Sequence, residues 1–160
     1  MNKKIPELDT LYREIILDHY KCPRGRGKIE CPDITFDGYN PVCGDEVNIS
    51  LKFNDGKIEE VAVNATGCAI SVAAGSMLAE LLPGKNMEEI REIGSQFQKL
   101  LHGEEKNINL DKIGDLDTME GVSKFPVRIK CALLAWKTIE HALQKHSDEH
   151  HSHTKTTVIE

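Results

Sequence analysis

The stretch NPVCGDEVNISLKF, residues 40–53, places a cysteine and an aspartate on a tight turn that leads into a strand. A proline and a glycine flank the cysteine, and the residues that follow alternate between apolar and polar, which is the period of a half-exposed β-strand. A cysteine in a core needs no such turn, and a cysteine in a disulfide needs no neighbouring acid. The stretch therefore predicts two metal-grade ligands, Cys43 and Asp45, presented side by side where a strand begins.

The alternation continues on both sides of this strand. An NDGK hairpin signal follows it, the return strand IEEVAVNAT spans 58–66, and a short strand candidate, ITFDGYN, precedes the turn at 34–40. Ile58 is out of phase with the rest of its strand, so either it faces solvent or a β-bulge resets the register. The residues expected to share the inner face of the return strand are Val61, Val63 and Ala65.

The helical period dominates the rest of the chain. Apolar residues recur every three or four positions in 7–20, 68–82 and 125–146, and shorter helices are expected at about 86–101 and 107–116. Together these segments predict an α+β fold in which a three-stranded antiparallel sheet packs against several helices. The sequence predicts a single domain over residues 1–146 and a polar, histidine-containing tail over 147–160.

The composition narrows the class of protein. The chain has 160 residues and a formal net charge of −6, which argues against a nucleic-acid binder because such proteins normally carry a basic face. It contains neither an apolar run long enough for a membrane span nor a signal-peptide pattern, so the expected location is cytoplasmic. Thiols stay reduced there; the five cysteines are expected to be buried, catalytic or metal-binding, and they are Cys22, Cys31, Cys43, Cys68 and Cys131.

Three of these cysteines lie where elements begin or end. Cys43 lies at the corner entering a strand, Cys68 at the corner leaving the sheet, and Cys131 early in the last helix. With Asp45 they make a set of three sulfurs and one oxygen, which suits Zn²⁺ and also iron–sulfur chemistry. From the spacing alone, three buried structural cysteines and a solvated aspartate remain the alternative.

Local charge favours the thiolate form at two of the three cysteines. Cys68 is expected at the positive end of a helix dipole. Arg128 and Lys130 lie beside Cys131 in the sequence and act in the same direction. A thiolate can serve as a metal ligand or as a sulfur nucleophile.

The chain resembles the IscU/NifU-N family of iron–sulfur cluster assembly proteins, most closely its SufU-type branch. The resemblance covers most of residues 7–145, and its motifs are LYREIILDHYKCPRGRG at 11–27, NPVCGDEVNISLKF at 40–53, ATGCAISVAAGSMLAELLPGK at 65–85 and FPVRIKCALLAWKTIEHAL at 125–143. It implies a compact SufE/NifU-like fold and carries over Cys43, Asp45, Cys68 and Cys131 as the metal ligands.

Two departures point to the SufU-type branch. IscU proper has a histidine immediately before its third cysteine, where this sequence has Lys130, and the segment between Cys68 and Cys131 is longer than in IscU. The resemblance therefore implies a zinc-bound sulfur acceptor, a zinc-dependent sulfurtransferase that works with a PLP-dependent cysteine desulfurase of the SufS kind.

The alternatives concern what the same residues do. As a sulfur acceptor, the protein would use Cys43, whose loop is the easiest to detach, with Cys131 as the rival catalytic residue and with Arg128 and Lys130 docking the partner. As a scaffold, it would hold a transient [2Fe–2S] cluster and pass it to a downstream scaffold or to apo iron–sulfur proteins. As a structural zinc domain, it would do neither.

Other residues invite weaker hypotheses. Cys22 and Cys31 both precede proline in the loop after the first helix and are expected to be idle thiols. Five of the seven histidines follow residue 140, and incidental metal affinity is the simplest expectation for them. They are His141, His146, His150, His151 and His153.

Overall fold

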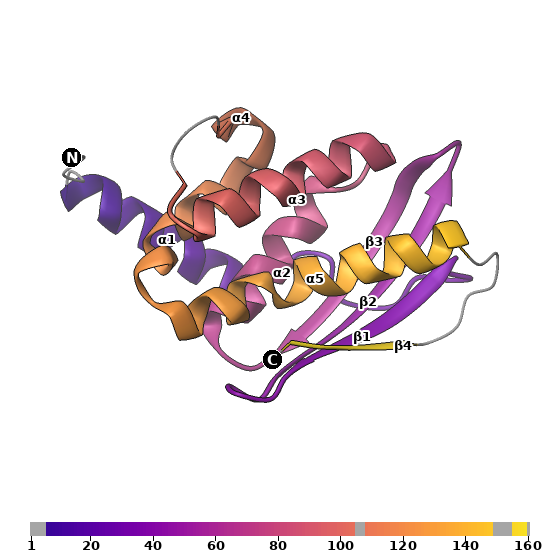
Figure 1. Cartoon of the computed structure of the whole chain (residues 1–160), viewed down its shortest axis with the longest axis horizontal. Helices are drawn as coiled ribbons and strands as arrows, with labels where there is room; N and C mark the ends of the chain where they lie inside the picture. Colours follow the sequence, from indigo (N-terminus) through magenta and orange to yellow (C-terminus); the bar gives the residue numbers. More distant parts are fainter. Residues whose placement is uncertain (1–5, 105–107, 149–154, 160) are drawn as a thin grey trace.

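A sheet covered on one face by helices forms the body of the molecule (Figure 1). The computed structural model describes residues 6–104, 108–148 and 155–159. In chain order the elements are α1 (Pro6–Lys21), β1 (Ile34–Asn40), β2 (Asp45–Asn54), β3 (Lys57–Thr66), α2 (Ala69–Leu81), α3 (Met87–Leu101), α4 (Leu110–Ile113), the 3₁₀ helix η1 (Gly114–Lys124), α5 (Pro126–Asp148) and β4 (Lys155–Val158).

The predicted three-stranded antiparallel sheet is confirmed. β2 pairs with β1 on one side and with β3 on the other, both antiparallel. The register shifts between Lys52 and Phe53, which places Ile58 in the core at 1% exposure. Of the two possibilities for Ile58, the bulge is therefore the one that the structure adopts.

A fourth strand corrects the expectation of an aperiodic tail. β4 pairs in parallel with β1, so the strand order is β3-β2-β1-β4, and the Ile159 amide donates to the Tyr39 carbonyl at 3.0 Å. Without β4, β1 would be an edge strand with unpaired backbone groups, and Thr156, Thr157 and Val158 are β-branched residues that favour extended backbone. The histidines of the expected tail at positions 150, 151 and 153 lie outside the described residues.

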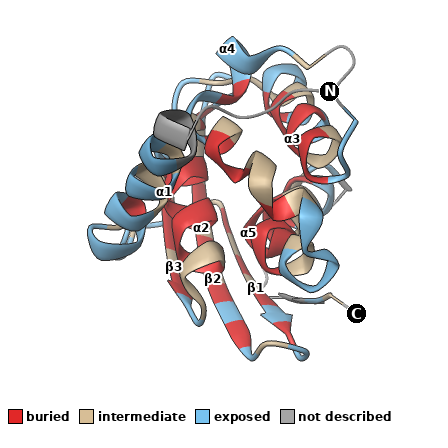
Figure 2. Cartoon of the chain, turned by 90° about the vertical axis from the view of Figure 1, so that its left-hand side faces the viewer, coloured by how far each residue is buried: buried red, intermediate tan, exposed pale blue. Residues whose placement is uncertain are grey.

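The core lies between the sheet and the helices α2 and α5, as the buried residues in Figure 2 show. From β2 the side chains of Val47, Ile49 and Leu51 face inward at 3% exposure or less. Most of α2 is buried, from Ser71 to Ala79, so this helix lies within the core. These two helices begin at the same end of the sheet, and this is where the cysteines gather.

The region after α3 differs from its prediction. Of the helix expected at 107–116, position 107 lies outside the described residues, and the short α4 ends at Ile113. Gly114 follows it with a φ of 52°, in the left-handed region. The 3₁₀ helix η1 then leads to Phe125. Over the described part of the chain, no helix combines the length and apolar character that crossing a membrane requires.

Helix α1 is anchored by a buried histidine. His19 is 1% exposed; its Nδ1 lies 2.7 Å from Ser76 Oγ of α2, and its Nε2 lies 2.8 Å from Asp115 Oδ2 of η1. Ser76 Oγ also accepts the Arg24 backbone N–H at 2.8 Å. Leu11, which also lies in the helix expected at 7–20, is by contrast 48% exposed.

Candidate metal centre

The turn between β1 and β2 brings Cys43 to the end of the sheet. Asn40 and Asp45 face each other as the last pair of the ladder, and the Gly44 amide donates to the Asn40 carbonyl at 2.8 Å. Gly44 has a φ of +72°, a conformation that glycine adopts without a steric penalty. The four-residue turn therefore presents Cys43 at its tip, half-buried.

Cys68 arrives at the same place because β3 ends beside the start of β2. Thr66 pairs with Glu46, and Cys68 then caps α2, its Sγ accepting the Ser71 N–H at 3.4 Å. The predicted position at a helix N-terminus is confirmed. A Cβ at Gly67 would collide with the Asp45 carboxylate, so only glycine permits this close approach.

Cys131 completes the group from α5. Its Sγ lies 3.3 Å from Cys43 Sγ, and the ligand atoms of Cys43, Asp45 and Cys131 all lie within 4.8 Å of one another. Cys68 adjoins this group through Asp45: its Sγ lies 3.9 Å from Asp45 Oδ2 and its backbone N–H donates to Oδ1 at 2.9 Å. Of the four residues predicted from the sequence, the structure thus gathers Cys43, Asp45 and Cys131 in one cluster and places Cys68 against its Asp45.

The donor set fits a divalent cation. Two sulfurs bound at about 2.3 Å to one tetrahedral zinc lie about 3.8 Å apart, close to the separation between Cys131 and Cys43. Asp45 is fully buried among sulfur atoms, and a buried carboxylate is costly unless a counter-charge compensates it. A cation shared by these side chains would supply that charge.

Asn40 belongs to the site although the sequence analysis did not single it out. It is fully buried, and its Nδ2 donates to Asp45 Oδ2 at 3.4 Å and to Cys131 Sγ at 3.6 Å. Its Oδ1 accepts the Val42 N–H at 3.2 Å. The sequence did contain a signal for this role, because Asn40 directly precedes the proline of the turn. An asparagine side chain at such a position often bonds the backbone two residues further on.

The electrostatics of the site depend on whether a cation is bound. Burial raises the pKa of Cys131 far above its ordinary value, and hydrogen bonding with Asp45 and Cys43 acts in the same direction. At Cys131, burial thus outweighs the stabilisation of the thiolate that was expected from Arg128 and Lys130. The side chain therefore stays a thiol in the metal-free protein. Arg128 lies nearby on the exposed side of α5, where its interaction with Cys131 and the charge of Cys68 raise its own pKa.

The remaining sequence candidates lie elsewhere. Lys130 is half-buried in α5 and is not among the residues that line the groove described below. Cys22 and Cys31 are exposed, and neither joins a cluster of metal-ligating side chains in the described part of the chain.

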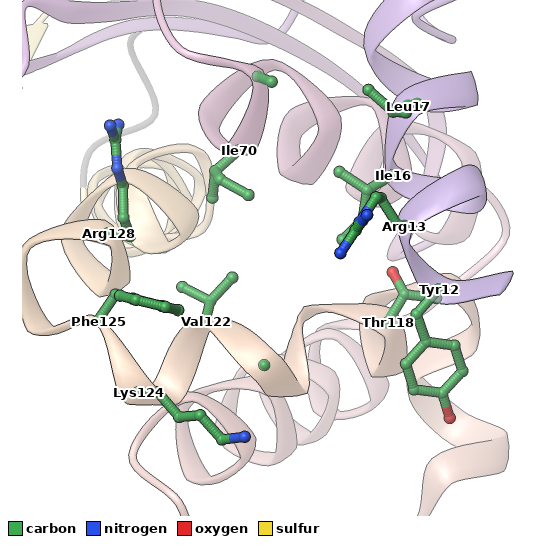
Figure 3. A pocket seen from close by; sticks show the side chains of 12 residues that line it. Tyr12, Arg13, Ile16, Leu17, Ile70, Thr118, Val122, Lys124, Phe125 and Arg128 are labelled. Carbon is green, nitrogen blue, oxygen red and sulfur yellow. The ribbon is translucent and has the colours of Figure 1, made fainter. Parts of the chain in front are cut away.

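An apolar groove of about 550 Å³ lies between α1, the start of α2, η1 and the start of α5. It lies beside the cysteines because its lining includes Ala69, which follows Cys68, and Arg128, which interacts with Cys131. Figure 3 shows Ile16, Ile70 and Val122 pointing into it from three elements. Phe125 lies on its wall and is 60% exposed. The charged residues of the lining are all basic: Arg13, Lys124 and Arg128.

Fold and site together define an α+β domain with a candidate metal centre of three cysteines and one aspartate at one end of its sheet. The family model of the NifU-like N terminal domain matches residues 11–132, and the chain belongs to this family. The resemblance stated from the sequence is thereby confirmed.

Individual relatives agree with this assignment. The chain is 40% identical to the zinc-dependent sulfurtransferase SufU of Bacillus subtilis, over 86% of this chain and 92% of that protein. It is 33% identical to the iron–sulfur cluster assembly scaffold protein IscU of Streptococcus pyogenes, over 92% of this chain and 91% of the other.

A solved structure with the same fold is that of a proposed SUF-system scaffold protein, FiSufU, from Fervidobacterium islandicum AW-1. It superposes with a TM-score of 0.77 at 35% identity and covers 84% of this chain and 97% of that one.

Metal binding is expected to release protons and to tighten as pH rises from about 6 to about 8. The reason is that the raised pKa of Cys131 keeps its proton in the metal-free protein, and this proton must leave before the sulfur can bind Zn²⁺. Chelator competition at several pH values measures the affinity, and calorimetry in buffers of different ionisation enthalpy counts the protons. An affinity independent of pH would contradict this electrostatic description.

Proposed function

We propose that this protein acts in iron–sulfur cluster biogenesis as a zinc-binding acceptor of persulfide sulfur from a PLP-dependent cysteine desulfurase. The observation that carries the proposal is the meeting of Cys43, Asp45 and Cys131 within 4.8 Å, with Cys68 adjoining through Asp45. The 40% identity to a zinc-dependent sulfurtransferase supports zinc as the ion and sulfur transfer as the reaction.

Cys43, Asp45, Cys68 and Cys131 would hold the zinc. When bound, Zn²⁺ stabilises coordinating sulfurs as thiolates near neutral pH and protects them from oxidation. Burial disfavours the charged form of Cys131, so the bound ion would stabilise its thiolate. The four side chains would in turn hold the ion in place.

The transfer step exchanges one sulfur–sulfur bond for another. The Cys43 thiolate attacks the outer sulfur of a persulfide on the desulfurase cysteine and forms a new S–S bond to it. The S–S bond within the desulfurase persulfide breaks, and its electron pair stays on the desulfurase cysteine, which leaves as a thiolate. The outer sulfur keeps its proton. Because one S–S bond forms as another breaks, the transfer involves no net oxidation or reduction.

Exposure favours Cys43 over Cys131 as the acceptor. Cys43 is half-buried on a four-residue turn, whereas Cys131 is fully buried in α5. An incoming persulfide has to reach the attacking sulfur in line with its S–S bond, which a fully enclosed sulfur does not allow. Cys131 is therefore proposed as a retained ligand.

The groove beside the cysteines is proposed as part of the surface on which the desulfurase docks. Its apolar lining and exposed Phe125 offer burial, and its basic rim selects a partner with acidic residues around the persulfide. Arg128 is the docking charge nearest the cysteines. Lys130, the second predicted docking residue, lies next to Cys131 and is proposed only as an accessory contact because it is half-buried.

A scaffold function is the alternative, and the identity to IscU proteins favours it. The same four ligands would then hold a transient [2Fe–2S] cluster for delivery to a downstream scaffold or to apo iron–sulfur proteins. Anaerobic loading with iron and sulfide separates the two functions: a stable chromophore that passes to an apo-ferredoxin would favour the scaffold. A purely structural zinc domain would unfold without zinc and leave desulfurase turnover unaffected.

Replacing Cys43 by alanine is expected to abolish the stimulation of a SufS-type desulfurase, because the acceptor of its sulfur is lost. The measurement is alanine production from free cysteine with and without this protein. Cys22→Ala removes an exposed thiol outside the site and should retain full stimulation. If Cys43→Ala stimulates as well as the wild type, the acceptor assignment is wrong.

Reversing the charge at Arg128 is expected to weaken docking without removing the metal ligands. With Arg128→Glu, half-maximal stimulation of the desulfurase should require a several-fold higher protein concentration, while bound zinc remains unchanged. Arg91→Glu makes the same charge change on the exposed side of α3 and serves as the control. Equal effects of the two variants would mean that net charge, not the groove, governs association.

A further inference from the structure

The side chain of Asn40 connects three parts of the metal centre. From the last residue of β1, its amide nitrogen reaches Asp45 of β2 and Cys131 of α5, and its amide oxygen accepts the backbone N–H of Val42 in the turn that carries Cys43. No other residue of the described chain has hydrogen bonds to all three of these parts among those the structure records. Because Asn40 is fully buried, water does not compete for these bonds.

The bonds are distributed unequally over the four ligands. Asp45 receives the Asn40 amide on Oδ2 and the Cys68 backbone N–H on Oδ1. Cys131 receives the Asn40 amide as well. Cys68 accepts the Ser71 N–H at 3.4 Å. Among the hydrogen bonds recorded over the described residues, Cys43 Sγ accepts only the Cys131 S–H, at 3.3 Å, and that proton would leave when a metal binds. The Val42 bond shapes the turn that carries Cys43.

This inequality has a chemical consequence for the sulfurs. A sulfur whose electron pair accepts an N–H is held in place and is a weaker nucleophile than a thiolate without an N–H donor. Asn40 thus restrains Cys131 and Asp45, and it leaves Cys43 as the sulfur that is free to react.

We propose that Asn40 is a positioning residue that confines sulfur acceptance to Cys43 by holding Asp45 and Cys131 in the metal centre. The inference rests on the proposed function, because it concerns which of the proposed ligands takes the sulfur. To the burial of Cys131 it adds a second restraint, a neutral amide that holds this sulfur in the centre.

The variant that separates the roles of Asn40 is Asn40→Ser. A serine hydroxyl can still accept the Val42 N–H and so preserve the turn, but it is too short to reach Asp45 and Cys131. The matched control is Asn48→Ser. Asn48 lies on β2 and donates to the Asp37 carboxylate at 2.7 Å, which is the same kind of bond, but away from the cysteines.

The test uses the full-length, zinc-loaded protein with a SufS-type desulfurase and free cysteine, and it locates the persulfide by mass spectrometry of peptides. In the wild type and in Asn48→Ser, sulfur is expected on Cys43 alone. In Asn40→Ser, sulfur is expected on both Cys43 and Cys131, and zinc affinity is expected to fall about 10-fold or more by chelator competition. Persulfide confined to Cys43 in Asn40→Ser overturns the proposal, whatever its zinc affinity.

A second measurement applies if Asn40→Ser accepts no sulfur. Iodoacetamide labelling of the zinc-loaded proteins reports which sulfur is released: several-fold more labelling of Cys131 than in Asn48→Ser supports the proposal, and equal labelling contradicts it. A wild type that binds no zinc or takes no sulfur would instead contradict the proposed function. The two failures are therefore distinguishable.

Discussion

The metal centre depends on the register of β2 against its two neighbours. The pair Asn40–Asp45 closes the ladder on one side and Glu46–Thr66 on the other, so both turns carrying cysteines leave the sheet at the same end. Because side chains alternate between the two faces of a strand, a slip of one residue would turn Asp45 away from the helices. The inward residues of β2, packed under α2 and α5, fix this register at the same time as they form the core.

The centre is a compromise between burial and charge. Enclosing Asp45 and Cys131 excludes water, which raises the cost of negative charge on both. The protein offsets part of that cost with N–H donors from Cys68 and Asn40. A divalent cation would offset the rest, because it would replace the thiol proton and neutralise the carboxylate. Affinity for the ion and reactivity of the sulfurs therefore follow from the same packing, and a change in one of them alters the other.

Local patterns were sufficient to predict much of the fold. The two-residue period of β2 and β3 and the helical period around residue 131 correspond to observed elements, and the out-of-phase Ile58 correctly indicated a possible bulge. The fourth strand was not predictable in this way, because its pairing with β1 is set by a long-range contact and not by its own short sequence. The length of the helix after α3 was misjudged because the sequence does not show that Gly114 adopts a positive φ.

Three of the four expected ligands form one cluster and the fourth, Cys68, adjoins it, yet the sequence analysis missed the residues that make this arrangement possible. The resemblance to a family pointed to the cysteines and Asp45, whereas Asn40 and Gly67 act through a buried amide and through the absence of a side chain. Such roles become visible only when strands and helices are placed together.

X-ray absorption spectroscopy of the zinc-loaded protein tests the central claim most directly. Three sulfurs at about 2.3 Å and one oxygen at about 2.0 Å are predicted, and a first shell with four sulfurs, or with fewer than three, would contradict a single ion shared by Cys43, Asp45, Cys68 and Cys131.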